Sequence, residues 1–178
     1  TMKHFFIVFA LLFGCTFAYA QKVVYPLIPM FGPVTEVPFA TDVIDKKEEY
    51  KVLVDITSPS ANPKEISEFF ENIARIANLH VAGGVNPKKL KIVAVVHGGA
   101  VPFIVNNETY KQKFGVDNPN LPVFTAIKKA GIPLYVCGQT LFKRKVDPAT
   151  LAPEFEAVLS AITTITTYVN KGYVFLKF

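Results

Sequence analysis

Apolar runs alternate with amphipathic segments along most of this chain. Four runs, at residues 50–56, 90–96, 132–136 and 173–177, have the length and the content of branched aliphatic and aromatic residues that are typical of strands. The run at 90–96 is apolar almost throughout, as expected for a strand that is covered on both faces. The pattern therefore predicts four strands.

Helical spacing of apolar residues marks much of the chain between these strands. The first helix is predicted to begin at Asn62, because Asn can cap a helix, Pro63 suits its first position and Glu65 completes a capping box. It is predicted to end at Gly83 and Gly84. The remaining segments are interpreted as a polar excursion at residues 106–118 and as helices at residues 98–105, 121–130, 139–145 and 153–170.

The alternation of strands and helices decides the predicted fold class. Strands separated by helices imply right-handed crossover connections and parallel pairing. We therefore predict an α/β fold, a three-layer sandwich in which a mostly parallel sheet is flanked by helices on both faces. This single domain is predicted to span residues 49–178, which is long enough for one hydrophobic core.

A proline-rich segment at residues 21–48 precedes the predicted domain. It contains Pro26, Pro29, Pro33 and Pro38. Proline at this density prevents helix formation and interrupts the hydrogen bonding of a sheet. We interpret the segment as an extended arm that lies on the domain or on a neighbouring subunit.

The first 20 residues have the pattern of a secretory signal peptide. An apolar run from Phe5 to Phe13 precedes the small-x-small pattern of Ala18-Tyr19-Ala20. A membrane-spanning helix needs about 20 apolar residues, so this run is too short for one. We predict cleavage after Ala20 and an exported, periplasmic protein. The alternative is a lipoprotein processing site, which would leave the protein lipid-anchored through Cys15.

The chain is mildly basic, with 19 Lys and Arg residues against 14 Asp and Glu residues and a formal net charge of +5. Its lysines are spread in short pairs, such as Lys88 with Lys89 and Lys128 with Lys129, without interleaved aromatic residues. This distribution does not support nucleic-acid binding. We also predict no metal site, no cofactor and no stable transmembrane segment.

Cys137 is the one cysteine that remains once the predicted signal peptide is removed. It lies between the apolar run at 132–136 and Gly138, so it falls where a strand meets a helix. A disulfide within the mature chain is excluded, which leaves an apolar filler, an intermolecular partner or a reactive thiol. At a helix N-terminus the dipole would lower the pKa of this thiol from the free value of about 8.5. The lysines and arginine that follow it, which either add positive potential or are solvated, are Lys143, Arg144 and Lys145.

A second strand end carries His97, Gly98 and Gly99. Ligands of open parallel sheets bind at the carboxyl ends of the strands, so we expect this segment and Cys137 at one edge, side by side. Glycines between a strand and a helix let backbone N–H groups turn toward an anion. Gly98, Gly99 and Gly138 are therefore candidate ligand-binding residues, with tight turns as the alternative. His97 is a candidate catalytic base or thiol orienter, with a structural histidine as the alternative.

Three segments, at residues 93–101, 130–141 and 171–176, together resemble the DsrE/DsrF-like family, and the likeness extends over about residues 50–178. The resemblance implies a parallel α/β sandwich and homo- or hetero-oligomers, often trimers or hexamers. It also implies, for the sulfur-relay members, a persulfide carried on the cysteine that corresponds to Cys137. Some relatives have a further cysteine three residues later, where this chain has Thr140, so a two-cysteine redox pair is excluded here.

These observations lead to one main hypothesis and two alternatives. The main hypothesis is an exported homo-oligomer, a trimer or hexamer, that binds or transfers sulfane sulfur through a persulfide on Cys137. A second protein would act as sulfur donor or acceptor. The first alternative is a non-catalytic oligomeric binding or scaffold module in which Cys137 is merely packed. The second is thiol redox sensing through a disulfide between subunits.

Overall fold

The computed structural model of the protein describes residues 22–41 and 43–178. The predicted signal peptide, its cleavage after Ala20 and the alternative lipid anchor at Cys15 lie outside the described residues. No helix within the described ranges is both long enough and apolar enough to span a membrane.

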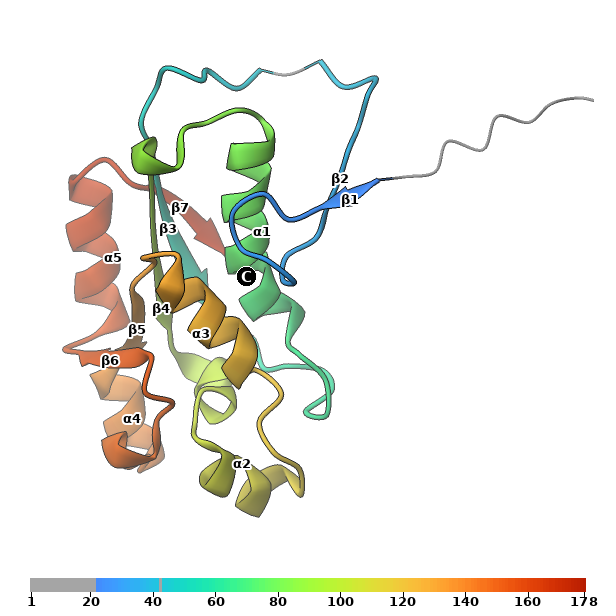
Figure 1. The fold of residues 1–178 in the computed structure, drawn as a ribbon. Helices are drawn as coiled ribbons and strands as arrows, with labels where there is room; N and C mark the ends of the chain where they lie inside the picture. Colours follow the sequence, from blue (N-terminus) through green and yellow to red (C-terminus); the bar gives the residue numbers. More distant parts are fainter. Residues whose placement is uncertain (1–21, 42) are drawn as a thin grey trace, which may run out of the picture.

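The domain is built on a five-stranded parallel sheet with strand order β6-β5-β4-β3-β7. The predicted α/β sandwich with a mostly parallel sheet is therefore confirmed (Figure 1). The two central strands have the bounds that the sequence predicted. The strands are β3 (Tyr50–Ile56), β4 (Leu90–Val96), β5 (Leu134–Cys137), β6 (Phe155–Val158) and β7 (Val174–Lys177).

Helices cover the two faces of this sheet unequally (Figure 1). On one face, α1 (Glu68–Ala82) and α3 (Leu121–Lys129) enclose the larger hydrophobic core, in which Phe124 packs edge-on against Phe70 and Phe155. On the other face, α5 (Ala161–Asn170) covers a smaller cluster. The members of that cluster are Leu53, Val93, Val95, Cys137 and Ala161, with Tyr135, Ile165, Tyr168 and Tyr173 packed against them.

Shorter helices occupy the loops at the carboxyl edge of the sheet. Asn106 caps α2 (Asn107–Phe114), since its side chain accepts a hydrogen bond from the Thr109 amide, and Gly115 ends that helix in the left-handed conformation. The segment interpreted as a polar excursion is therefore a capped helix. The others at this edge are α4 (Gly138–Arg144) and the 3-10 turns Gly98–Phe103 and Pro148–Thr150, whereas the 3-10 turn Pro87–Lys89 directly precedes β4 at the opposite, amino edge.

The prediction of one long helix at residues 153–170 was wrong. Its first part is the edge strand β6, and the helix α5 begins only after Ser160, whose side chain accepts a hydrogen bond from the Thr163 amide. Leu159 and Ile162, which the helical spacing placed on a buried face, are 71% and 75% exposed. A four-residue strand has too few alternating polar and apolar positions to be recognised when the same residues also fit a helical pattern that continues into α5.

The start of α1 also differs from its prediction. Asn62 does not cap this helix but closes a local turn, in which its side chain accepts a hydrogen bond from the Lys64 amide. The helix begins after Ser67, whose amide donates to the side chain of Asn120 at 2.8 Å. A contact with a distant residue therefore decides the helix start. The predicted end of the helix at Gly83 is confirmed.

The N-terminal arm forms a short hairpin that lies against α1. Strand β1 (Val23–Val24) pairs antiparallel with β2 (Val34–Thr35). The loop between them packs against the helix, and Ile28 in this loop is fully buried in the larger core. Gly32 approaches the helix so closely that a Cβ atom there would lie 2.2 Å from the Arg75 amide nitrogen.

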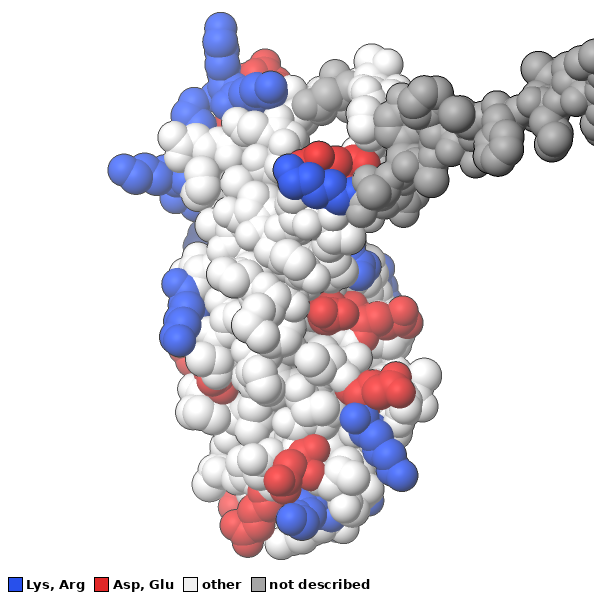
Figure 2. Space-filling model, turned by 45° about the vertical axis from the view of Figure 1, so that its right-hand side comes forward, with Lys and Arg blue, Asp and Glu red and all other residues white. Residues whose placement is uncertain are grey.

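Charged side chains are scattered over the surface. Figure 2 shows a face on which Lys and Arg alternate with Asp and Glu around a broad uncharged area. Several of these charges form exposed pairs, such as Lys111 with Asp117 at 3.5 Å and Lys128 with Glu156 at 2.8 Å. Exposed pairs of this kind contribute little to stability.

Candidate functional site

The carboxyl ends of β3, β4 and β5 bring three titratable side chains to one face of the sheet. Alternation along each strand places Asp55 on the face of Leu53, and His97 on the face of Val95. Cys137 belongs to that same face, the one that α5 covers.

His97 and Cys137 are neighbours across two adjacent strands. The last residues of β4 and β5 that pair are Val96 and Val136, and His97 and Cys137 directly follow them. The His97 amide donates to the Ile56 carbonyl at 3.0 Å, so the regular pairing of β3 with β4 continues to His97. Adjacent strands lie about 4.8 Å apart. The expectation that both strand ends meet at one edge of the sheet is confirmed.

His97 has an acidic partner. Its Nε2 atom lies 2.8 Å from Oδ1 of Asp55. Neither atom makes a hydrogen bond of regular geometry among the described residues, so the contact is a close polar contact rather than a linear N–H···O bond. The Asp55 side chain is almost fully buried, whereas the His97 side chain is 29% exposed. The pair therefore connects the interior of the sheet to its edge.

Burial is the main influence on Asp55, and it raises the pKa of this carboxyl above its ordinary value. The nearby His97 and Lys177, which pairs with Asp55 across β3 and β7, oppose that effect. Asp55 is the only residue with a formal charge among the buried residues that the structure describes. A buried carboxyl group in an apolar strand is costly for folding, so its position calls for an explanation.

Cys137 lies at the junction of β5 and α4 and is only 4% exposed. Burial alone would raise the pKa of its thiol, and burial is the largest single influence. Hydrogen bonding from the Thr140 hydroxyl and from the amides of Ala161, Thr140 and Gln139 together outweighs it, so the pKa lies below its ordinary value. The Cys137 side chain makes no capping hydrogen bond of regular geometry at the start of α4, so these amides act on the sulfur as nearby dipoles.

The donors to the sulfur come from two helices. Gln139 and Thr140 belong to the first turn of α4, whereas Ala161 is the first residue of α5. The N-termini of both helices therefore converge on one sulfur atom, and both dipoles favour its negative charge. This environment suits a thiolate, or the terminal sulfur of a persulfide, better than a neutral thiol.

The three candidate glycines lie beside these residues and have clear packing roles. A Cβ atom on Gly138 would lie 2.7 Å from the Val158 carbonyl oxygen, and one on Gly99 would lie 2.9 Å from Cδ of Pro59. Gly98 has a φ of +59°, which favours glycine. Their role in ligand binding stays a prediction.

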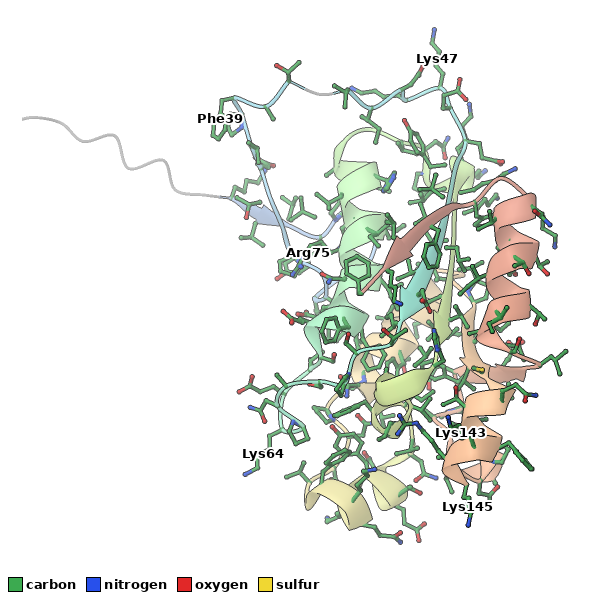
Figure 3. The ribbon with its side chains drawn as sticks, turned by 180° about the vertical axis from the view of Figure 1, so that it is seen from behind. Phe39, Lys47, Lys64, Arg75, Lys143 and Lys145 are labelled. Carbon is green, nitrogen blue, oxygen red and sulfur yellow. The ribbon has the colours of Figure 1, made fainter. Side chains whose placement is uncertain are left out.

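The basic residues that follow Cys137 belong to the solvent-exposed end of α4. Lys143, Arg144 and Lys145 are exposed, and Figure 3 shows Lys143 and Lys145 at the outer end of α4. Solvent screens their effect on the thiol. Of the two alternatives for these residues, solvated surface side chains describe them better than a source of positive potential at the thiol.

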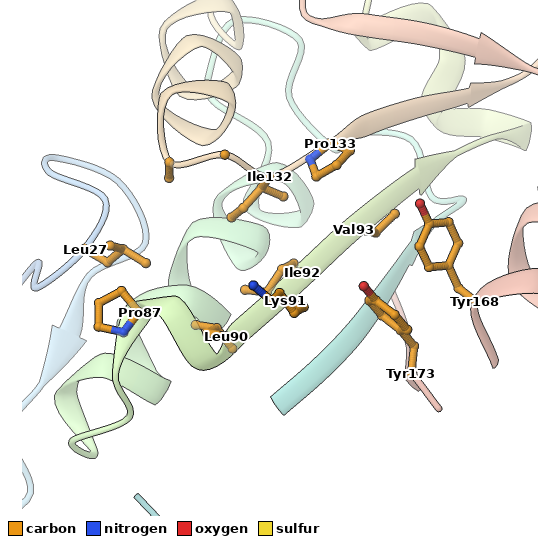
Figure 4. Close-up of a pocket in the computed structure, with 12 residues that line it drawn as sticks. Leu27, Pro87, Leu90, Lys91, Ile92, Val93, Ile132, Pro133, Tyr168 and Tyr173 are labelled. Carbon is orange, nitrogen blue, oxygen red and sulfur yellow. The ribbon is translucent and has the colours of Figure 1, made fainter. Parts of the chain in front are cut away.

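A cavity of about 370 Å³ opens at the opposite edge of the sheet (Figure 4). Its walls include Leu90 and Lys91 at the start of β4, Pro133 before β5, and the rings of Tyr168 and Tyr173. It lies at the amino ends of the strands, so it is separate from the edge that holds Cys137. Among the described residues, no group of three or more His, Cys, Asp or Glu side chains is arranged to hold a metal ion.

Residues 51–178 match the family model described as the DsrE/DsrF-like family. The chain belongs to the DsrE/DsrF-like family. Cys137 and the His97-Gly98-Gly99 turn both lie within the matched residues. No curated protein matches the chain.

Two solved structures share the fold of this DsrE/DsrF-like chain. One is the protein of unknown function MTH1491 from Methanobacterium thermoautotrophicum, with a TM-score of 0.52, 16% sequence identity, and coverage of 72% of this chain and 98% of that one. The other is the ychN protein from E. coli, with a TM-score of 0.51, 13% identity, and coverage of 72% and 99%. At these identities the likeness concerns the fold alone.

Sequence reasoning missed Asp55 and Ala161 in this DsrE/DsrF-like site. One signal for Asp55 was present, since an acidic residue inside an otherwise apolar strand needs a partner when it is buried. Its identification with His97 required the strand order. No local signal marked Ala161, because it reaches Cys137 only through the path of the chain from β6 to α5.

Proposed function

We propose that this protein accepts sulfane sulfur on Cys137 and carries it as a persulfide. The observation that supports this function most directly is the set of donors around the sulfur. They lower the pKa of a buried thiol that would otherwise be inert. Membership of the DsrE/DsrF-like family agrees with a sulfur-relay role.

The chemistry is an exchange at sulfur. Cys137 loses its proton, and its thiolate attacks the outer sulfur atom of a donor persulfide, R–S–SH. A bond forms between the two sulfur atoms while the S–S bond of the donor breaks. The donor leaves as a thiolate, takes up a proton and is released as R–SH, and Cys137 becomes Cys–S–SH. The donor's inner sulfur is reduced as the Cys137 sulfur is oxidised, so no further oxidant is needed.

His97 is the proposed proton carrier in this exchange. It is the neighbour of Cys137 on β4 and is partly exposed. An imidazole can accept the thiol proton and return it to the departing thiolate near neutral pH. The Gly98-Gly99 turn and Gly138 are proposed to leave room for the added sulfur and to direct backbone N–H groups toward it.

Access to the sulfur involves the turn between β6 and α5. This turn packs directly on the start of α4, because Gly138 faces the Val158 carbonyl oxygen. Leu159 within the turn is largely exposed. A shift of this turn is the proposed route by which a donor reaches Cys137.

Oligomerisation and export are parts of the same proposal. We propose a homo-oligomer, a trimer or hexamer, that exchanges sulfur with a partner protein. Its subunits are proposed to contact through apolar side chains that the single chain leaves exposed, among them Phe142, Leu159 and Ile162. Export to the periplasm rests on the pattern of residues 1–20.

The alternative function is a non-catalytic oligomeric binding or scaffold module. The small exposure of Cys137 favours it, because a buried cysteine commonly serves as a small apolar side chain. The exposed apolar residues around α5 would then be the functional surface. The two functions differ in the reactivity of the thiol.

The deciding experiment is sulfur loading followed by mass spectrometry. The full-length chain is incubated with glutathione persulfide, and peptides containing Cys15 and Cys137 are weighed. We expect one added sulfur atom on the Cys137 peptide, retention of this addition in Cys15→Ser, and its loss in Cys137→Ser. An unmodified Cys137 peptide, with a thiol that stays unreactive at neutral pH, would establish the scaffold alternative.

A further inference from the structure

We propose that Asp55 is a positioning residue for sulfur exchange, acting on Cys137 through His97. This inference rests on the proposed sulfur-carrier function. The three side chains would form a relay across three adjacent strands, with Asp55 on β3, His97 on β4 and Cys137 on β5.

The place of Asp55 in the core is the first reason. A carboxyl that is 2% exposed in an apolar strand costs stability unless it is paired. A branched apolar residue at this position would fill the space without that cost. A charge kept at such a cost, at the carboxyl end of a parallel strand, is typical of a functional group.

The geometry of the contact between Asp55 and His97 is the second reason. Oδ1 of Asp55 lies against Nε2 of His97 and has no other polar partner among the described residues. A carboxylate beside Nε2 stabilises a proton on that nitrogen. Nδ1 is then the basic nitrogen of the neutral ring, the atom that can accept a proton from a thiol. Asp55 would thus select the tautomer and fix the ring.

The other charged groups around Asp55 and His97 are compatible with this role of Asp55. On β7, Lys177 lies beside Asp55. On β6, Glu156 is held by Lys128 at 2.8 Å. The first turn of α5 contains no acidic residue, and Lys143 and Arg144 of α4 are exposed. Asp55 is therefore the acidic group that acts on His97 most strongly.

The role of each group in the exchange follows. His97 Nδ1 accepts the proton of the Cys137 thiol as the thiolate attacks the outer sulfur of the donor. The imidazolium is stabilised by the Asp55 carboxylate during this step. The same proton then goes to the departing donor thiolate. Asp55 keeps its own charge throughout and touches neither sulfur.

The test compares sulfur-loading rates as a function of pH for four variants. They are Asp55→Asn, His97→Gln, the double variant, and Asp117→Asn, which removes an exposed acidic partner of Lys111. A general base contributes about 100-fold or more to a rate. We expect the sulfur-loading rate to fall about 100-fold in His97→Gln and about tenfold in Asp55→Asn. The pH profile should change in the same way in both, and the double variant should be no slower than His97→Gln.

Other outcomes would overturn the inference without touching the proposed function. They are a uniform slowing in Asp55→Asn with the wild-type pH profile, or additive losses in the double variant. Either would make Asp55 a structural residue. A wild-type protein that takes up no sulfur would instead refute the proposed function.

A second measurement covers the case in which Asp55→Asn does not fold. The Asp55 carboxyl is titrated by carbon NMR in the wild type and in His97→Gln. Because His97 opposes the effect of burial, its removal should raise the pKa of Asp55 further. An unchanged titration would show that the two groups do not interact, and the relay would be excluded.

Discussion

Asn78 on α1 binds both backbone polar groups of Ile28 in the N-terminal arm. Its Oδ1 accepts from the Ile28 amide at 2.8 Å, and its Nδ2 donates to the Ile28 carbonyl at 3.2 Å. The same side chain also contacts the backbone of Leu27, Phe31 and Gly32 at 2.9 to 3.0 Å. One fully buried amide therefore replaces the strand pairing that the proline-rich loop lacks.

Replacement of Asn78 by Ala should release the arm. Several backbone groups of the loop would lose their partner, which costs about 2 to 4 kcal/mol in the free energy of unfolding. Urea unfolding measures this loss, and limited proteolysis should cut within residues 25–33. The matched control is Asn72→Ala on the same helix, whose side chain contacts Arg75 at 2.6 Å. Equal stability of the two variants would show that the arm is not held by Asn78.

Thr140 offers a test of the thiol environment that does not depend on sulfur transfer. Thr140→Val removes a hydroxyl that stabilises the Cys137 thiolate, so the pKa of the thiol should rise. A hydrogen bond to a charged group contributes about 1.5 kcal/mol, so alkylation at neutral pH should slow about tenfold. Iodoacetamide labelling across pH measures both. Thr140→Ser keeps the hydroxyl and should be alkylated at the wild-type rate. Equally slow alkylation of Thr140→Ser and Thr140→Val would instead show that the effect comes from packing.

Asp55 should make the stability of the protein fall as pH rises. Its pKa in the folded state is raised above 3.8 by burial, so the folded state binds the proton more tightly than the unfolded state. Stability from this group is therefore present at low pH and lost as pH rises above 3.8. Asp55→Asn should gain stability relative to the wild type across that range.

Urea unfolding of both proteins at several pH values checks this sign. The difference in unfolding free energy should move in favour of Asp55→Asn with rising pH and level off once the wild-type carboxyl is ionised. A difference that moves the other way would mean that His97 and Lys177 stabilise the carboxylate more than burial penalises it. A folded Asp55→Asn at neutral pH also makes the kinetic test of the relay possible.

The sequence predicted the central strands of this fold better than its short edge strand and its connecting loops. Strands β3 and β4 are long, apolar and central, and their pattern was sufficient. Edge strand β6 contains four residues and was hidden in a helical pattern that α5 continues. Similarly, His97 and Cys137 could be placed at one sheet edge from their strands alone. The contact of His97 with Asp55 depends on the order of the strands, and the contact of Cys137 with Ala161 depends on the path of the loop between β6 and α5. Local spacing in the sequence encodes neither of them.

The exposed apolar side chains around α5 should hold subunits together. Ile162 in the first turn of this helix is 75% exposed, and Leu159 just before the helix is 71% exposed. Ile162→Lys should therefore reduce the mass of the assembly in light scattering, because a lysine cannot be buried between two apolar surfaces without a partner. Phe39→Lys, at a 91% exposed position in the arm, is the control. If Phe39→Lys dissociates the assembly and Ile162→Lys does not, the arm forms the interface; a wild-type monomer would contradict the proposed oligomer.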